Sequence, residues 1–197
     1  CIRARLAVLA LVFACLFAAG CTGRCPAGSS TDSAGRASAG QGSSVYDYTV
    51  TSGTGEQIRL ADFRGKVILI VNTATGCGFT PQYAPLERLY RECHAKGLEI
   101  LDIPCNQFGA QAPGTDEEIR KFCTLHYSTT FPQMRKADVN GANELPLYAF
   151  LKSKKGFAGF GDHKYKAPLE KMLAKGDPNW AKTPDIKWNF TKFVVDR

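Results

Sequence analysis

The sequence predicts an α/β protein with a mixed central sheet, flanked by helices and preceded by a β-hairpin. The first observation is an apolar run over residues 67–71, rich in β-branched side chains, which is typical of a central strand covered on both faces. The second is a helical pattern over residues 81–96, with another apolar run after it over residues 98–103. A strand, a helix and a strand of these lengths indicate a βαβ unit, so these two strands are predicted to be parallel.

The hairpin is predicted ahead of this unit. Residues 45–50 alternate between apolar and polar types, and residues 57–60 return as a second short strand. The connection between them, residues 52–55, reads SGTG. Turn residues between two short strands are the usual signal for an antiparallel pair.

A single cysteine lies where the first central strand leads into the helix. The junction reads NTATGCGFT over residues 72–80, and we predict Thr80 as the N-cap and Pro81 as the first helical residue. Cys77 would then lie just before a helix N-terminus. There, free backbone N–H groups and the positive end of the helix dipole favour the nucleophilic thiolate over the thiol.

Two glycines flank this cysteine. Gly76 and Gly78 let the backbone bend and leave the sulfur open to a small substrate. A half-buried structural cysteine is the alternative interpretation. The order of strand, glycine, cysteine, glycine and helix favours a reactive Cys77.

The helix predicted over residues 81–96 is amphipathic and ends at Gly97. Cys93 falls on its apolar stripe and is therefore interpreted as a core residue. The next strand runs into PCNQFGAQ, residues 104–111. The polar segments follow two adjacent parallel strands. We therefore expect both segments at the carboxyl ends of the strands, where α/β sheets place their functional sites. The apolar stripe consists of Tyr83, Leu86, Leu89, Tyr90 and Cys93.

A second helix is predicted to open with a capping box formed by Thr115 and Glu118. His126 is interpreted as a partly buried residue of this helix rather than a catalytic base. The positions that recur with helical spacing are Ile119, Phe122, Cys123 and His126.

Three further elements are predicted downstream. A helix covers residues 145–155 and begins near Pro146, and a short amphipathic stretch covers residues 167–175. Residues 185–195 indicate a last strand.

The first 44 residues are assigned outside this domain, which spans residues 45–197. Residues 1–20 resemble a signal peptide, because arginines precede an apolar run that is short for a membrane span and small residues then lead to Cys21. The pattern resembles a bacterial lipoprotein signal with Cys21 as the lipidated residue. Ala18 stands where such signals more often have leucine, so cleavage without lipid is the alternative.

Residues 21–44 are rich in glycine, serine and alanine and are interpreted as a flexible tether. Together, signal and tether predict an exported protein, anchored to a membrane through its lipid and facing the periplasm or the cell exterior.

Composition narrows the choice of partners. The net charge of +7 comes from basic residues spread along the chain without a nucleic-acid motif, so we predict a solvated basic face and no nucleic-acid binding. The eight cysteines show no zinc-site spacing, and no metal or organic cofactor is expected. Four of them fall in the domain, where two structural disulfides are the alternative to a reactive pair.

Four separated motifs occur in order between residues 72 and 196: NTATGCGFT, IPCNQFGAQAPG, a helix ending in FC with FPQ soon after, and IKWNFTKFVVD. They resemble the glutathione peroxidase family, in its cysteine-containing, thioredoxin-dependent branch. The resemblance implies a thioredoxin-like fold and an antioxidant activity, the reduction of hydrogen peroxide or organic hydroperoxides to water or alcohols. By motif position it implies that Cys77 is the peroxidatic residue, that Gln111, Trp188 and Asn189 complete a catalytic tetrad, and that Cys123 is the resolving cysteine.

The residue types agree with this chemistry. A thiolate that attacks a peroxide forms a sulfenic acid and releases an alkoxide or hydroxide, so the site must stabilise negative charge on sulfur and then on oxygen. The amides of Gln111 and Asn189 and the indole N–H of Trp188 are neutral donors suited to this. Taken singly, each would be a core or turn residue, but the four motifs together favour the catalytic interpretation.

Cys123 lies on the inward face of its helix, so a buried thiol far from Cys77 is expected before oxidation. Disulfide formation brings two Cα atoms within about 7 Å, which predicts local unfolding of this helix on oxidation. A resolving cysteine indicates a thioredoxin-like protein as the reductant, with glutathione as the alternative. Cys105 is interpreted as structural.

The sequence departs from the family pattern at two places. Ala112 stands where the family often has glutamate, a change expected to be tolerated. Family members continue past the last strand, so the chain is expected to be truncated at its C-terminus, with an exposed sheet edge. Residues 156–184 form a longer segment than in short monomeric members, and the oligomeric state is left open.

Two competing functions remain. A membrane-tethered thiol–disulfide oxidoreductase without peroxidase activity would usually carry a second cysteine at the position of Thr80. A non-catalytic surface lipoprotein on the same fold is the other alternative. Peroxide consumption separates the peroxidase from both, and insulin reduction separates these two from each other.

Overall fold

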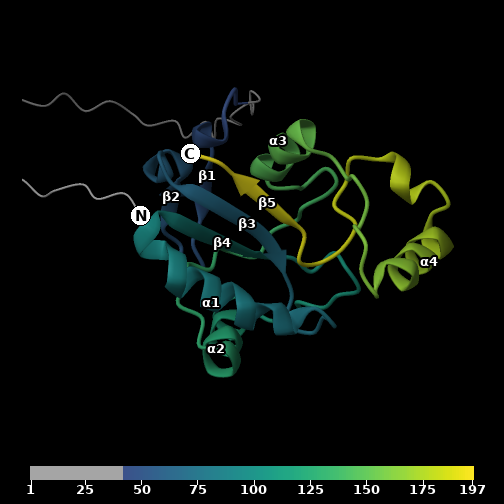
Figure 1. The fold of residues 1–197 in the computed structure, drawn as a ribbon, viewed down its shortest axis with the longest axis horizontal. Coiled ribbons are helices and arrows are strands. Elements are labelled where there is room, and N and C mark those ends of the chain that lie inside the picture. Colours follow the sequence, from purple (N-terminus) through teal and green to yellow (C-terminus); the bar gives the residue numbers. More distant parts are fainter. Residues whose placement is uncertain (1–41) are drawn as a thin grey trace, which may run out of the picture. The chain divides into compact units, whose positions relative to one another are not determined.

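The computed structural model describes residues 42–197, so the predicted signal segment, Cys21 and most of the predicted tether lie outside the described residues. At its centre is a three-stranded sheet with the order β4, β3, β5 (Figure 1). β3 (Val67–Thr73) pairs in parallel with β4 (Leu98–Pro104) and antiparallel with β5 (Lys192–Val195). The predicted mixed sheet is therefore confirmed, and α1 (Tyr83–Cys93) is the crossover helix of the predicted βαβ unit.

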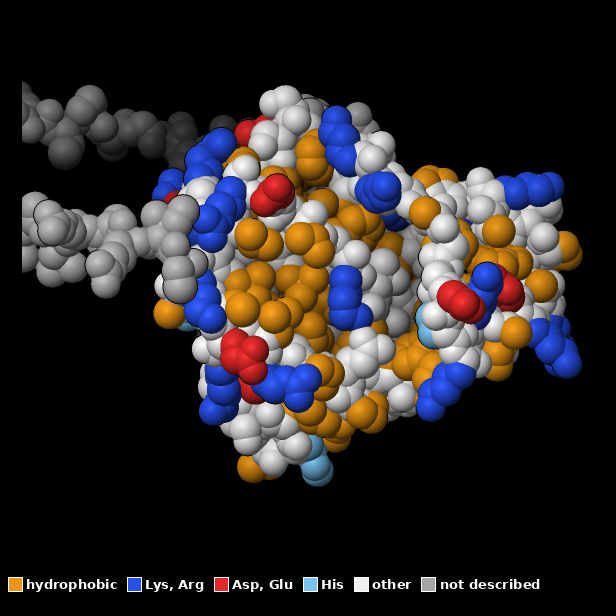
Figure 2. Space-filling view, in the orientation of Figure 1, with side chains coloured by type: hydrophobic (Ala, Val, Ile, Leu, Met, Phe, Trp, Pro, Cys, Tyr) orange, Lys and Arg blue, Asp and Glu red, His pale blue; other side chains and the backbone are white. Residues whose placement is uncertain are grey.

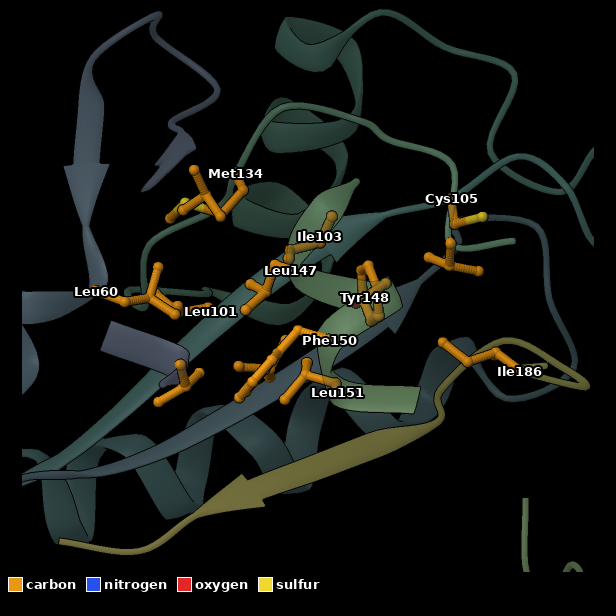
Figure 3. Close-up of a cluster of buried hydrophobic side chains, with 14 of the residues drawn as sticks. Leu60, Leu101, Ile103, Cys105, Met134, Leu147, Tyr148, Phe150, Leu151 and Ile186 are labelled. Carbon is orange, nitrogen blue, oxygen red and sulfur yellow. The ribbon is translucent and has the colours of Figure 1, made fainter. Parts of the chain in front are cut away.

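Both faces of the two parallel strands are covered, which explains why their sequences are apolar almost throughout. In each strand every residue after the first is buried. α1 and α2 (Asp116–Tyr127) cover one face and α3 (Pro146–Lys154) the other (Figure 1). Figure 3 shows Leu147 and Tyr148 of α3 packed beside Leu101 and Ile103 of β4.

The predicted hairpin is present but shorter than expected. β1 (Thr49–Thr51) pairs antiparallel with β2 (Gln57–Arg59). Val45–Asp47 form a turn of 3₁₀ helix instead of strand, because Ser44 and Asp47 make a capping box that closes the backbone locally. The Gly42 N–H donates to the Tyr48 hydroxyl at 3.1 Å. Gly42 and Ser44, which the sequence pattern assigned to the end of the tether, thus hydrogen-bond to the first residues of the domain.

A short extended segment joins the hairpin to the central sheet. The Met134 N–H donates to the Asp102 carbonyl of β4 at 2.7 Å. On the other side of the same segment, the Gly53 N–H donates to the Gln133 carbonyl at 2.9 Å. The hairpin is thereby attached to the outer edge of β4.

α1 begins later than predicted. Thr80–Gln82 form a 3₁₀ turn, and Thr80 does not cap the helix because its hydroxyl bonds to the preceding loop. The predicted apolar stripe is only partly buried, since Leu89 is 39% exposed and Cys93 is half-buried. Both residues face a surface groove beside β5 rather than the core. Cys93 is therefore not the core residue that its helical position predicted.

The groove beside α1 is apolar. It has a volume of about 370 Å³, and one of its lining residues, Val194 of β5, is 71% exposed. Figure 2 shows apolar side chains gathered over this side of the sheet. β5 pairs with β3 on one side, and no other strand of residues 42–197 covers its outer edge.

α2 opens with the predicted capping box: the Glu118 N–H donates to Thr115 Oγ1 at 3.2 Å, and the Thr115 N–H donates to Glu118 Oε2 at 2.7 Å. Only Ile119 and Cys123 of this helix are buried. His126 is exposed, contrary to the expectation of partial burial, and its ring lies against Phe122 at 4.5 Å between centroids.

α3 and α4 (Lys166–Gly176) agree with the predicted downstream helices. Lys152 of α3 is 7% exposed and contacts the carboxylates of Glu144 and Asp185, which fixes the end of the long segment that contains α4. None of the helices in residues 42–197 has the length and apolarity needed to cross a bilayer.

Candidate active site

Cys77 lies in the loop after β3 and is 7% exposed. The Phe79 N–H donates to Cys77 Sγ at 3.3 Å. This N–H is free to do so because it lies in a loop, before the first helical hydrogen bonds begin. The sulfur therefore has a backbone donor aimed at it by the local turn, a more specific arrangement than the helix dipole that the sequence suggested.

Thr80 holds this turn together. Its Oγ1 accepts the Cys77 N–H at 3.0 Å and donates to the Ala74 carbonyl at 2.9 Å. The Thr80 N–H also donates to the Cys77 carbonyl at 2.9 Å. The predicted N-cap is thus a brace for the cysteine loop, because the chain makes an additional tight turn before α1 begins.

The two glycines around Cys77 have different roles. The Gly76 N–H donates to the Gln111 carbonyl at 2.8 Å, and a Cβ at Gly76 would lie only 3.2 Å from that oxygen. Gly78 has no atom within 4 Å of the position where a Cβ would lie. Gly76 therefore permits close approach of the second polar loop, whereas Gly78 leaves open space beside the cysteine.

Two predicted site residues that are distant in sequence meet directly. Asn189 Nδ2 donates to Gln111 Oε1 at 3.0 Å, and Asn189 is 3% exposed. Ala110, just before Gln111, and Phe190, just after Asn189, adopt left-handed φ angles of 51° and 65°. Non-glycine residues pay a conformational cost in this region and tend to occur at functional sites.

The segment that carries Trp188 and Asn189 is a turn, although the sequence pattern indicated a strand from residue 185. Asn72, at the end of β3, causes this difference. Its carbonyl accepts the Phe190 N–H at 2.6 Å, and its Nδ2 donates to the Trp188 carbonyl at 3.3 Å. The Trp188 ring packs on Phe108, with 5.8 Å between ring centroids.

A second asparagine fixes the approach to this turn. Asn140 Nδ2 donates to the Ile186 carbonyl at 2.8 Å, and Asn140 Oδ1 accepts the Ile186 N–H at 3.0 Å. Sequence reasoning missed both Asn72 and Asn140. Neither fits a periodic or catalytic pattern, and their partners lie far along the chain.

Cys123 lies on α2 and is 1% exposed, so the burial predicted from its helical position is confirmed. Tyr83 of α1 lies in the same buried cluster as Cys123. Burial, together with the nearby negative charge of Asp102, raises the pKa of Cys123 to about 12. While α2 stays folded, this cysteine is held as a thiol.

The remaining cysteines lie outside this arrangement. Cys105 is fully buried, burial raises its pKa, and its Sγ donates to Gln107 Oε1 at 3.7 Å, which suits the structural role predicted for it. The four cysteines of the described chain are all free. Residues 42–197 contain no group of three His, Cys, Asp or Glu side chains placed to hold a metal ion.

A cavity of about 790 Å³ opens beside the cysteine loop. Gly78 and Phe79 form one wall, and Trp188 and Asn189 contribute another. The far side comes from the segment around α4. Lys192 also lines the cavity, and its ammonium group donates to Gln82 Oε1 at 2.7 Å. The residue as a whole is exposed, but desolvation around the ammonium group lowers its pKa. The aromatic residues of the far side are Phe157, Phe160 and Tyr165.

Known proteins resemble this chain over the same region. The family model described as glutathione peroxidase matches residues 45–152. A glutathione peroxidase homolog of Neisseria meningitidis is 49% identical over 153 residues, covering 78% of this chain and 85% of that protein. A hydroperoxy fatty acid reductase of Synechocystis is 44% identical over 153 residues, covering 78% of this chain and 80% of that protein.

A solved structure supports the same conclusion. The crystal structure of T. cruzi GPX1 matches with a TM-score of 0.51 at 31% identity, covering 78% of this chain and 80% of that one. The predicted fold class is confirmed. On these similarities, and with a cysteine loop, two contacting amides and a buried second cysteine in place, the chain belongs to the glutathione peroxidase family and is a peroxidase of the oxidoreductase class.

Proposed function

We propose that this protein is a two-cysteine thiol peroxidase that reduces hydrogen peroxide and organic hydroperoxides. The observation that carries the proposal is the Phe79 N–H that donates to Cys77 Sγ at 3.3 Å. A sulfur that accepts an N–H bond beside neutral amide donors is equipped to carry negative charge. Cys77 is the peroxidatic residue in this proposal.

In the first step, the Cys77 thiolate attacks the terminal oxygen of the hydroperoxide. An S–O bond forms and the O–O bond breaks, so sulfur is oxidised to a sulfenic acid and the peroxide is reduced to an alcohol or water after taking up a proton. Charge develops on the departing oxygen. The amides of Gln111 and Asn189 are held together by their mutual hydrogen bond of 3.0 Å and serve, with Trp188, as donors to that oxygen.

In the second step, the thiol of Cys123 attacks the sulfur of the Cys77 sulfenic acid. The S–S bond forms, the S–O bond breaks, and hydroxide leaves as water with the proton of the thiol. Cys123 is 1% exposed, so α2 has to unfold locally before this step. A thioredoxin-like dithiol protein then reduces the disulfide by exchange, with glutathione as the alternative reductant.

The cavity beside Cys77 favours an organic hydroperoxide with an apolar chain. Its aromatic walls would bury the chain, and Gly78 and Phe79, the two residues after Cys77, line the cavity. The name of the Synechocystis relative, a hydroperoxy fatty acid reductase, supports the same substrate class. We propose fatty acid hydroperoxides as substrates in addition to hydrogen peroxide.

The test is NADPH consumption with hydrogen peroxide, thioredoxin and thioredoxin reductase, using the wild type, Cys77→Ser and Cys93→Ser. Cys93 is a half-buried cysteine outside the site and serves as the matched control. Turnover in the wild type and in Cys93→Ser, with none in Cys77→Ser, is the expected result. Equal turnover of the wild type and Cys77→Ser would refute the assignment.

Two added assays separate the remaining alternatives. Replacing the thioredoxin pair with glutathione and glutathione reductase identifies the reductant. An insulin-reduction assay without peroxide tests for a thiol–disulfide oxidoreductase, for which insulin reduction without peroxide consumption is the diagnostic result.

We also propose export through the N-terminal signal and anchoring through a lipid on Cys21, on the basis of the sequence pattern. The full-length protein should sediment with bacterial membranes, and Cys21→Ala should move it to the soluble fraction. A membrane-bound Cys21→Ala protein would argue against a lipid at this residue.

A further inference from the structure

Three buried polar side chains form a hydrogen-bonded chain between the central sheet and α1. The Tyr83 hydroxyl donates to Thr73 Oγ1 at 2.7 Å, and Thr73 Oγ1 donates to Asp102 Oδ1 at 2.5 Å. The Tyr83 hydroxyl also lies 3.3 Å from Asp102 Oδ2. Thr73 and Tyr83 have no exposed surface and Asp102 is 1% exposed, so water does not reach the carboxyl group.

Asp102 has no cationic partner. None of the ion pairs formed within residues 42–197 reaches it. A buried carboxylate without a counter-charge is costly, and the two hydroxyl donors offset only part of that cost. Burial accordingly raises the pKa of Asp102 to about 7.

The buried face of α2 packs against this hydrogen-bonded chain. Tyr83 and Cys123 belong to the same buried cluster, and the ring centroids of Tyr83 and Tyr127 of α2 are 5.4 Å apart. Tyr83 therefore connects Asp102 with the buried face of α2. The charge of Asp102 disfavours a thiolate at Cys123.

The other titratable groups around Asp102 do not change charge near neutral pH. Tyr83 of α1 and Tyr148 of α3 both have pKa values raised well above the ordinary range by burial and by the Asp102 charge. Cys123 of α2 has a pKa of about 12, and β3 contributes only the Thr73 hydroxyl. Asp102 is therefore the group that ionises in this network between mildly acidic and neutral pH.

α2 is attached weakly to the sheet between two firmly held ends. Ile119 and Cys123 are its only buried residues, and Leu125 is 70% exposed. After the helix, the Glu87 carboxylate accepts the Thr130 N–H at 2.7 Å. Before the helix, Lys136 Nζ donates to the Gly114 carbonyl at 2.6 Å. The helix can leave the sheet while the chain on either side stays in place.

We propose that Asp102, acting through Tyr83, controls the release of the resolving cysteine: α2 stays docked while Asp102 is protonated and undocks more readily once Asp102 is ionised. This inference rests on the proposed two-cysteine function. Asp102 and Tyr83 are positioning residues here, because neither touches the peroxide. The chemistry of disulfide formation is unchanged, with the thiol proton leaving as part of the water.

The direction of the effect comes from linkage. The docked form, in which Asp102 titrates near 7, binds the proton more tightly than an undocked form in which water reaches the carboxyl group. Docking is therefore fully stable below the ordinary pKa of an aspartate and loses stability as the pH rises towards 7. Above that pH, no further loss comes from Asp102.

The test is a stopped-flow experiment on the reduced protein with excess hydrogen peroxide, monitored by the fluorescence of Trp188. The other tryptophan, Trp180, is replaced by phenylalanine in every variant so that one reporter remains. The peroxide-dependent fast phase reports attack by Cys77, and the peroxide-independent slow phase reports disulfide formation. The measured quantity is the ratio of the slow-phase rate at pH 7.5 to the slow-phase rate at pH 5.0. It is determined for the wild type and for the isosteric variant Asp102→Asn.

Because thiol ionisation of released Cys123 contributes equally to both proteins, the comparison isolates Asp102. We expect the wild-type ratio to exceed the Asp102→Asn ratio by about tenfold, with the fast phases alike. Tyr83→Phe should shift the pH profile of the slow phase to higher pH, because the Asp102 carboxylate loses a hydrogen-bond donor that lowers its pKa. Equal ratios in the wild type and Asp102→Asn would overturn the proposal.

A second measurement needs no variant and no catalysis. Hydrogen exchange of α2 amides in the reduced wild type, corrected for the intrinsic pH dependence and compared with α3, should rise between pH 5.0 and pH 7.5. An unchanged ratio of α2 to α3 exchange would refute the control by Asp102 even if Asp102→Asn fails to fold. A missing fast phase in the wild type would instead refute the proposed peroxidase mechanism, and the exchange measurement would still decide the role of Asp102.

Discussion

Cys77 and Cys123 lie in the same hydrophobic cluster, yet their surroundings differ in almost every respect. Cys77 lies in a loop, where the Phe79 N–H donates to its sulfur and the open space at Gly78 leads to a cavity. Cys123 lies inside a helix, buried in the same cluster as Tyr83, whose hydroxyl lies 3.3 Å from the carboxyl group of Asp102.

The physical cause is the backbone around each sulfur. Within a helix the N–H groups are used by carbonyls four residues earlier, so none is left to stabilise a sulfur anion. A tight loop leaves N–H groups free to point at a side chain. The sulfur of Cys77 therefore accepts a backbone N–H, whereas the structure shows no such donor at the sulfur of Cys123 within residues 42–197.

Replacing Cys123 should produce the largest effect that separates the two regions. In Cys123→Ser, thioredoxin-supported turnover should fall to background, because the Cys77 sulfenic acid has no thiol with which to form a disulfide. The fast attack on peroxide should remain, since the hydrogen bonds at the Cys77 loop and between the two amides do not involve Cys123. Steady-state NADPH assays and mass spectrometry of a dimedone-trapped Cys77 measure the two steps. Wild-type turnover in Cys123→Ser would show that another group resolves the sulfenic acid.

Removing a donor at the Cys77 site should slow the first step. Asn189→Ala is expected to lower the rate of peroxide attack by about 100-fold, since it deletes one preorganised amide and frees its partner Gln111. The exposed residue Asn179, in the segment around α4, provides the matched control in Asn179→Ala. Single-turnover rates measure both variants. An unaltered rate in Asn189→Ala would remove this amide from the mechanism.

The glycines offer a smaller and more selective test. Gly76→Ala should slow peroxide attack about tenfold, because a Cβ 3.2 Å from the Gln111 carbonyl displaces the loop that carries this donor. Gly78→Ala should leave the free energy of unfolding within about 0.5 kcal/mol of the wild type, because its Cβ meets open space. Urea titrations and single-turnover rates compare the two variants. If both behave alike, the close approach at Gly76 does not position Gln111.

Much of the scaffold was determined by local sequence patterns. The apolar runs that became β3 and β4, the helical pattern between them and the capping box at Thr115 all describe interactions among near neighbours. Such patterns predicted the parallel pair, its crossover helix and the location of Cys77 at the end of a strand. They were less reliable at the ends of elements, where the start of α1 shifted from Pro81 to Tyr83.

The tertiary structure decided which polar groups meet. The contact between Asn189 and Gln111 spans 78 residues, and the turn at Trp188 exists because Asn72 bonds to its backbone. Periodicity predicts the helix or strand face on which a residue lies, but it does not predict which residue packs against that face. For that reason Leu89 and Cys93 of α1 and His126 of α2 were assigned more burial than they have, since the helix faces on which they lie are covered only in part.

The sequence by itself determined that the chain has an α/β scaffold, a cysteine at a strand end and the motifs of its family. Only the folded chain decided how each cysteine is held, because the Phe79 N–H at Cys77 and the Tyr83 and Asp102 groups behind Cys123 depend on turns and long-range packing. A hydrogen bond requires its donor and acceptor to be brought within about 3 Å, and it is the assembly of sheet and helices that sets such distances.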